Sequence, residues 1–404
     1  MNWKRTFWSA WFGQICSIMG FSFVLPFLPL YIRELGVSDA GEVAHWAGIA
    51  GFAAGITMAL FAPVWGFLAD RYGRKPMVLR SMFGGVVVLF LMAFCRDVTD
   101  LIILRLLQGM LTGTITAYLA LVSGATPPER SGFSLGMMQA AVFFGGSAGP
   151  LLGGVICEHM GFKAAFFVGA GLLFAGGMLV AIFAEERFQP AVEPRGGGMK
   201  AFAQIFATAG FVAALLTLFQ VHFANSVFQP VFPLYVEDLL GRVEGVKELT
   251  GQIIGMAGVA AAIAAVFLGR FSDAWGHRNL LIVCTLTAGL VTLPLAFAKS
   301  IPQLYALRVL FGFAAAGIMP SANAIIRKAV EPHHLGRAYG VTASVTCLGW
   351  GLGPLAGGYM AKHAGLREPF VLTGVILILT TVVVALFVKP GKILLNGTVD
   401  AADQ

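Results

Sequence analysis

Hydrophobic residues along this chain form long stretches that contain no Asp, Glu, Lys or Arg. There are twelve such stretches, and they cover residues 6–32, 46–69, 81–95, 106–128, 131–157, 164–184, 201–236, 249–269, 279–298, 309–326, 338–361 and 369–388. A helix needs about 20 apolar residues to cross the hydrocarbon core of a membrane, and most of the stretches reach that length. Strands of a membrane barrel would alternate apolar and polar residues, whereas these stretches are apolar on every side. The pattern predicts an all-α membrane protein with 12 transmembrane helices.

Three stretches reach full length only by taking in an arginine. The stretch 81–95 extends back through Arg80, whose long side chain can snorkel to the interface. The stretches 106–128 and 309–326 become full spans only if Arg105 and Arg308 lie inside the membrane. A charge in that position is costly and points to a function. Snorkelling is the alternative for both arginines, but their matching positions favour a shared role in a central cavity.

Composition and charge agree with a membrane protein and suggest its orientation. Of the 404 residues, 58% are hydrophobic and 12% are charged, and no soluble core of this length could bury so much apolar surface. Lys and Arg are about twice as frequent in the loops on the side of the termini, which predicts cytoplasmic termini in a bacterial inner membrane. Nucleic-acid binding is an alternative interpretation of the net charge of +7, but no loop carries a long basic tract. We therefore expect no nucleic-acid partner.

The second half of the chain repeats motifs of the first half. The segment 26–31 reappears at 230–235, Arg105 and Gly109 reappear as Arg308 and Gly312, and the glycine pattern of 145–154 reappears at 349–358. Parallel repeats of this kind place a substrate site at the midplane, between two halves related by a pseudo-two-fold axis. We predict one six-helix bundle over 1–184 and a cytoplasmic linker over 185–200. A second bundle with a short cytoplasmic tail would cover 201–404.

These motifs resemble the major facilitator superfamily along nearly the whole chain. Residues 66–75 resemble its signature loop between spans two and three, and Arg105 with Gln108 and Gly109 resembles the span-four motif of its proton-coupled drug exporters. Residues 2–5, 26–31, 34–37 and 186–190 resemble a bacterial multidrug resistance subgroup of its drug:proton antiporter family. One feature departs from that family. Several of its members carry a carboxylate inside the spans of the first half, whereas all 20 Asp and Glu residues here lie in loops or at span ends.

The resemblance implies a conformational latch in the signature loop. Its predicted residues are Gly66, Asp70, Arg71, Gly73, Arg74 and Lys75, with Asp273 in the second copy of the motif. Gly66 would permit close approach to span eleven near Gly336, and Asp70 would face the positive N-terminal end of that helix. The basic residues would pair with loop acids such as Glu129, and the latch would be closed when the transporter faces outward. The alternative is a basic turn that obeys the positive-inside rule.

The span-five segment resembles the antiporter motif of the drug exporters. Its residues are Gly145, Gly149, Pro150, Gly153 and Gly154. Glycines four residues apart let two helices pack tightly, and a proline inside the helix bends it. The resemblance pairs span five with span eight and span two with span eleven, and it implies that the motif seals the two halves. Ordinary helix packing is the alternative.

Polar residues inside the spans are candidates for a substrate or proton pathway. His222 lies in the middle of its span, and it is either a hydrogen-bonded structural histidine or a proton or substrate site, because histidine titrates near neutral pH. Together with Arg105 and Arg308, the candidates are His222, Gln14, Gln139, Gln220, Asn225 and Asn323.

The function that these observations favour is proton-coupled export of amphiphilic drugs, and hence antibiotic resistance. The two arginines have no carboxylate to balance them within the spans, so anionic or neutral drugs are expected to be preferred over cationic ones. Uptake or facilitated transport of a small metabolite is the main alternative. A membrane enzyme or sensor is a third, but the sequence has no H-E-x-x-H motif and no P-loop. We expect a monomer that binds a small-molecule substrate and protons, without cofactor or metal.

The predicted topology can be tested with reporter fusions. Reporters fused at Gly197 and near Gln404 should report the cytoplasm, and reporters fused near Asp39 or Glu244 should report the outside. A periplasmic signal at Gly197 would overturn the organisation into two parallel halves.

Overall fold

The computed structural model describes residues 2–186, 209–329 and 335–388. The helices of the first half are α1 (Trp3–Ser22), α2 (Leu28–Glu34), α3 (Ala40–Tyr72), α4 (Arg74–Met92), α5 (Val98–Leu111), α6 (Thr114–Ala125), α7 (Ser131–His159) and α8 (Gly161–Phe183). Those of the second half are α10 (Ala209–Val227), α11 (Phe232–Leu240), α12 (Val246–Trp275), α13 (His277–Leu295), α14 (Ile301–Ala315), α15 (Ile318–Ala329), α16 (Leu335–His363) and α17 (Glu368–Phe387). Short 3-10 turns occupy Leu25–Phe27 and Pro128–Arg130. Most of the predicted linker and the predicted tail lie outside the described residues.

Eleven segments of the described chain are long and apolar enough to cross a membrane. Four of them are pairs of short helices joined end to end, namely α1 with α2, α5 with α6, α10 with α11, and α14 with α15. The twelfth span is α16, which has 29 residues and is rich in glycine. The predicted all-α membrane fold is therefore confirmed.

Proline accounts for the breaks that separate α1 from α2 and α10 from α11. Pro26 lies in the turn before α2, and Pro233 opens α11; proline has no N–H to donate and cannot continue a helix without a break. After each break a tyrosine fixes the short helix to its own half. The Tyr31 hydroxyl donates to the carbonyl of Met92 over 2.7 Å, and the Tyr235 hydroxyl donates to the carbonyl of Leu295 over 3.0 Å. The repeated motif therefore builds the same joint twice.

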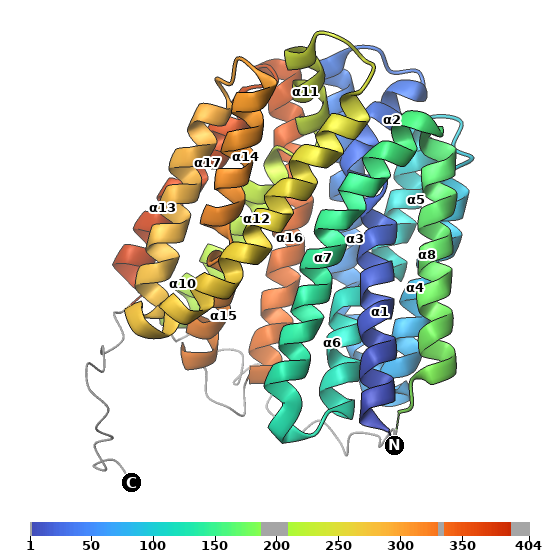
Figure 1. The fold of residues 1–404 in the computed structure, drawn as a ribbon, viewed down its shortest axis with the longest axis vertical. Helices are drawn as coiled ribbons and strands as arrows, with labels where there is room; N and C mark the ends of the chain where they lie inside the picture. Colours follow the sequence, from blue (N-terminus) through green and yellow to red (C-terminus); the bar gives the residue numbers. More distant parts are fainter. Residues whose placement is uncertain (1, 187–208, 330–334, 389–404) are drawn as a thin grey trace.

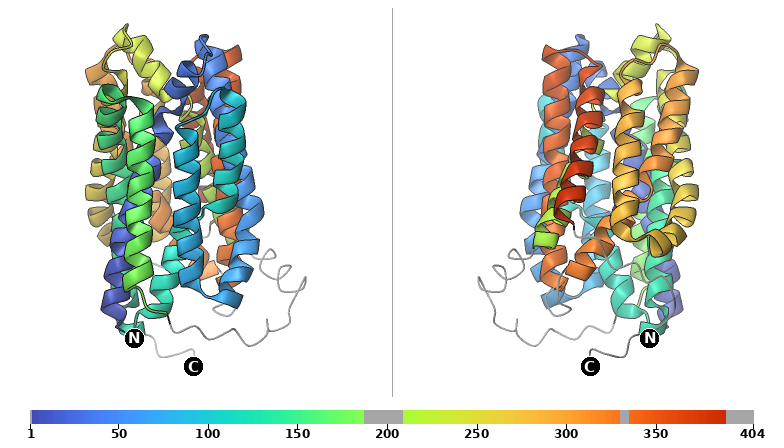
Figure 2. Two further views of the ribbon diagram at one scale, coloured as in Figure 1. Left: turned by 90° about the vertical axis from the view of Figure 1, so that its right-hand side faces the viewer. Right: turned by 90° about the vertical axis from the view of Figure 1, so that its left-hand side faces the viewer.

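The two bundles meet along four long helices (Figure 1). Helix α3 packs against α16, and α7 packs against α12, as the resemblance implied for spans two and eleven and for spans five and eight. We call the face where α1 begins the terminal face and the opposite one the distal face. In Figure 1, α7 and α12 lie close together near the distal face and diverge toward the terminal face. The side views of Figure 2 show the helices running along one common axis.

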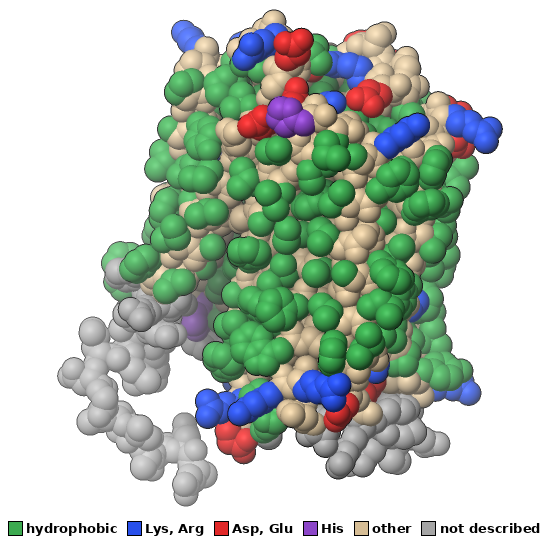
Figure 3. Space-filling model, turned by 45° about the vertical axis from the view of Figure 1, so that its right-hand side comes forward, with side chains coloured by type: hydrophobic (Ala, Val, Ile, Leu, Met, Phe, Trp, Pro, Cys, Tyr) green, Lys and Arg blue, Asp and Glu red, His purple; other side chains and the backbone are tan. Residues whose placement is uncertain are grey.

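The surface is that of a membrane-spanning bundle. On the side drawn in Figure 3, charged side chains gather at the two ends and a broad hydrophobic band lies between them. Large apolar residues such as Phe67, Phe144 and Phe174 are more than half exposed within the helices, which is stable only in contact with lipid.

Glycines bring the backbones of the two halves into contact. A Cβ added to Gly358 of α16 would lie 3.1 Å from the Cα of His45 in α3, and one added to Gly251 of α12 would lie 3.2 Å from the Cα of Gly154 in α7. The antiporter-motif glycines also face inward. Gly145 and Gly149 pack against α1, beside Ile18 and Ser22. The segment therefore joins α7 to α1 on one side and to α12 on the other.

Two alanine substitutions on α16 test these contacts. Gly358→Ala should lower the free energy of unfolding by about 1–3 kcal/mol, because the methyl group would meet the backbone of α3. Gly340→Ala is the matched control, since no atom lies within 4 Å of its added Cβ. That change should be neutral or stabilising by up to about 1 kcal/mol. Unfolding in detergent measures both, and equal effects would show that the close approach is not needed.

Candidate functional site

Arg105 lies in α5 and is buried, with 9% of its surface exposed. Its Nε donates to the carbonyl of Ala50 in α3 over 3.1 Å, and its Nη1 donates to the side-chain oxygen of Gln108. The side chain thus points into the bundle and does not snorkel outward. Asp100 stays near the distal end of α5, where it accepts a hydrogen bond from the backbone of Arg96. The positive charge of Arg105 is held by dipoles from α3 and from its own helix.

Arg308 lies at the equivalent position of α14 but has different surroundings. It is 7% exposed, and its guanidinium lies 4.6, 4.9 and 5.2 Å from the ring centres of Phe228, Phe232 and Phe311. Phe311 occupies the place of Gln108 in the repeat, so an aromatic face replaces an amide. Cation–π attraction of this kind strengthens when the cation is removed from water. Among the described residues, no carboxylate forms an ion pair with either arginine.

His222 is half-buried on α10 and lies beside Trp350 of α16, with 5.9 Å between ring centres. Its Nε2 is buried without a hydrogen-bond partner, and so is the side-chain oxygen of Gln220. Asn225 is half-buried on the same helix, and no described contact joins the three polar side chains. The hydrogen-bonded structural histidine of the alternative interpretation therefore lacks a partner at Nε2. Trp350 was missed because a single tryptophan in a glycine-rich span carries no distinctive signal.

A second group of buried polar atoms lies between α1 and α6. Gln14 and Ser17 of α1 are fully buried, and neither side chain has a hydrogen-bond partner. The hydroxyl of Tyr118 in α6 is also buried and unpartnered, and its ring packs on Gly13. Leaving such groups unsatisfied costs free energy, so they are expected to bind water or another polar molecule. Sequence reasoning found Gln14 but missed Tyr118, which lies in an otherwise apolar stretch.

The remaining candidates do not join either group. Gln139 is exposed on α7, and Asn323 is half-buried on α15. Arg80 was expected to snorkel to the interface, and that expectation was wrong. Its guanidinium stacks 3.6 Å from the ring centre of Trp65, and it donates to the carbonyl of Thr112 over 3.2 Å. It is a third arginine within the helix bundle.

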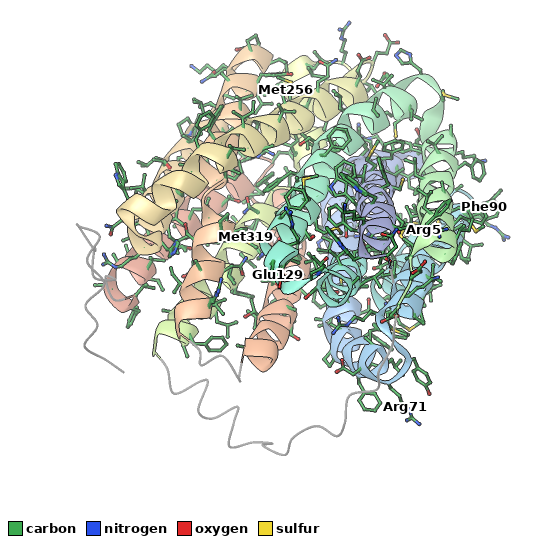
Figure 4. The ribbon with its side chains drawn as sticks, turned by 60° about the horizontal axis from the view of Figure 1, so that its bottom comes forward. Arg5, Arg71, Phe90, Glu129, Met256 and Met319 are labelled. Carbon is green, nitrogen blue, oxygen red and sulfur yellow. The ribbon has the colours of Figure 1, made fainter. Side chains whose placement is uncertain are left out.

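The signature loop binds a different acid from the one expected. The side chain of Glu186 accepts hydrogen bonds from the backbone N–H groups of Arg74 and Lys75, each over 2.7 Å. A carboxylate is favoured there because the N-terminal end of α4 is positive. Figure 4 shows Arg71 well apart from Glu129, the acid that we had expected to take part. The loop therefore ties α4 to the end of α8 within the first half.

The predicted contact between this loop and span eleven concerns Gly336, whose surroundings lie outside the described residues. No atom lies within 4 Å of a Cβ added to Gly66 in α3 or to Gly340 in α16, and Asp70 is exposed. Nearer the distal face α3 and α16 are in contact: the backbone of Gly351 lies against Gly55. The helices diverge toward the terminal face in this conformation, and the latch, which the resemblance implies closes when the transporter faces outward, stays a prediction. The side chain of Asp273 lies outside the described residues.

Comparison with known proteins agrees with the repeat and the fold. The Major Facilitator Superfamily model matches residues 10–246 and again residues 214–400. Multidrug resistance protein MdtG of Enterobacter lignolyticus is 32% identical over 393 residues, covering 96% of this chain and 93% of that protein. Multi-drug resistance efflux pump PmrA of Streptococcus pneumoniae is 33% identical over 377 residues, covering 92% of this chain and 93% of that protein. A solved structure of a point mutant of the nucleoside transporter NupG is similar with a TM-score of 0.78 at 13% identity, covering 96% of this chain and all of that one. The chain belongs to the major facilitator superfamily, and it is a transporter of that family.

Proposed function

We propose that this protein is a proton-coupled exporter of amphiphilic drugs. The observation that carries the proposal is similarity, along more than nine-tenths of the chain, to two proteins whose names describe multidrug resistance or efflux. Uptake of a small metabolite on the same fold remains the second candidate class. The functional unit is a single chain, with protons and a small molecule as its partners and no nucleic acid.

The divergence of the helices supports transport by alternating access. The two halves touch near the distal face, whereas a Cβ added to Gly66 or Gly340, two described glycines nearer the terminal face, would meet no atom within 4 Å. With cytoplasmic termini, the protein would here be open toward the cytoplasm, where an exporter loads its substrate. Rocking the halves would close the terminal face and open the distal one.

The chemistry of the buried side chains supports a preference for anionic or neutral substrates. Arg105 and Arg308 are both buried, and their symmetric placement brings positive charge to both halves. A low-dielectric site of one sign attracts the opposite charge and disfavours its own. Arginine keeps its proton, so coupling needs another carrier, either His222 or a span-end acid such as Glu34. Gln14, Gln220, Asn225, Gln139 and Asn323 are proposed as polar contacts along the pathway.

Transport into everted vesicles tests the function and its charge preference together. An acid-inside pH gradient should drive accumulation of an anionic amphiphile above that of a matched cation. Arg105→Gln and Arg308→Gln should each reduce anion transport about tenfold, since a hydrogen bond to a charged group is worth about 1.5–3 kcal/mol.

Arg96→Gln is the control for that experiment, because Arg96 is exposed near the distal face. Substrate accumulation that is the same with and without the pH gradient would favour the alternative function, facilitated transport of a metabolite. Equal or better transport of the cation by the unmutated protein would reject the charge preference.

The latch proposal concerns the state that closes the terminal face. Asp70→Asn should leave expression intact and slow transport roughly two- to fivefold, because a charge at a helix N-terminus is worth about 0.3–1 kcal/mol. Glu244→Gln is the control, since it removes an exposed carboxylate that takes no part in the latch. Cysteine accessibility from both faces should shift for Asp70→Asn alone. Unchanged transport and accessibility in that variant would remove Asp70 from the mechanism.

A further inference from the structure

Two oppositely charged residues meet where the short helices α2 and α11 come together. Nη1 of Arg33 donates to both carboxylate oxygens of Glu237, and the side chains are 27% and 18% exposed. Figure 1 places both helices at the distal face. This ion pair joins the first half of the molecule to the second.

The two residues occupy equivalent positions in the repeat. They are 204 residues apart, and the same offset relates Tyr31 to Tyr235. Residues related by a two-fold axis touch each other only where they lie next to that axis. The pair therefore marks the pseudo-two-fold axis at the distal face. Identical residues there would have placed two like charges in contact, whereas an arginine and a glutamate attract.

Each charged residue is attached firmly to its own half. Arg33 follows Tyr31 by two residues, and Glu237 follows Tyr235 by two residues. Because each tyrosine donates to a carbonyl of its own bundle, α2 and α11 must move with their bundles. Any rocking that parts the halves at the distal face must then separate Arg33 from Glu237. Arg33 Nε is buried without a hydrogen-bond partner among the described residues, so Glu237 supplies the acceptors that this guanidinium has across the boundary.

Other polar contacts join the halves around this pair. Lys247 Nζ lies 3.4 Å from Glu34, and Lys362 Nζ lies 2.8 Å from Glu42. Glu158 accepts from the backbone of Gly245 over 2.7 Å. In both lysine pairs the acid is more exposed than Glu237, with 52% and 43% of its side chain accessible, so water competes more strongly for them.

We propose that Arg33 and Glu237 form the lock of the distal gate, and that their separation is the electrostatic step by which the protein opens to that side. The lock rests on the proposed alternating-access function, but it requires no particular substrate. Loss of the pair should favour the distal-open state on the order of tenfold, as expected for a charge-assisted pair with two hydrogen bonds.

Spin-label distances across the distal face test the lock without any substrate. Labels at Met160→Cys and Val243→Cys, both exposed and one in each half, should report a longer distance when the gate opens. The background would carry serine at the five native cysteines. Arg33→Gln and Glu237→Gln should each raise the long-distance population on the order of tenfold. Glu237→Arg should raise it further, because two arginines would then repel.

The symmetry of the site supplies a rescue variant. Exchange of the charges, Arg33→Glu with Glu237→Arg, should return the distances to those of the unmutated protein, because the two positions are equivalent. The control is Glu248→Gln, which breaks the contact with His159, whose side chain is 66% exposed. Unchanged distances in both glutamine variants, or an exchange no better than Glu237→Arg alone, would overturn the lock. The variants could show the expected distance changes while the unmutated protein transports no drug. That result would count against the proposed function alone.

Discussion

Contact between helix backbones across the boundary of the two halves is the interaction on which this structure depends. Within a membrane, apolar side chains gain little by leaving lipid for protein, so association relies on close packing. Glycines of α3, α7, α12 and α16 allow that approach over the distal part of the boundary. Because van der Waals attraction falls steeply with distance, a small tilt is enough to lose it. The same surface can therefore hold the halves together and release them.

The two halves share one scaffold but place different chemistry on it. The arginine of the fourth span meets an amide and a carbonyl in one half and three aromatic rings in the other. The charged residue after the repeated tyrosine joint is basic in one half and acidic in the other. The repeat thus accounts for the shared geometry, and a few differing positions account for the different side-chain chemistry of the two halves.

Much of the fold could be predicted from the sequence because lipid imposes a simple pattern. Long apolar stretches give the spans, and the family resemblance gives the pairing of α3 with α16 and of α7 with α12. Contacts between distant elements could not be found in this way. The stacking of Arg80 on Trp65 and the binding of Glu186 at the start of α4 depend on three-dimensional proximity. The latch stays a prediction, because a motif records what a loop can bind and does not record which conformation is occupied.

The buried arginines have a further consequence because both lie within segments that are long and apolar enough to cross a membrane. One elementary charge that crosses the whole electric field of a membrane changes the free energy by about 2.3 kcal/mol per 100 mV. If rocking carries Arg105 and Arg308 through a tenth of the field, the balance between the two open states shifts by about 0.5 kcal/mol per 100 mV. No described carboxylate pairs with either arginine to cancel this displacement. Membrane voltage alone would then bias which face is open, and a voltage step applied to substrate-free protein would produce a transient charge movement.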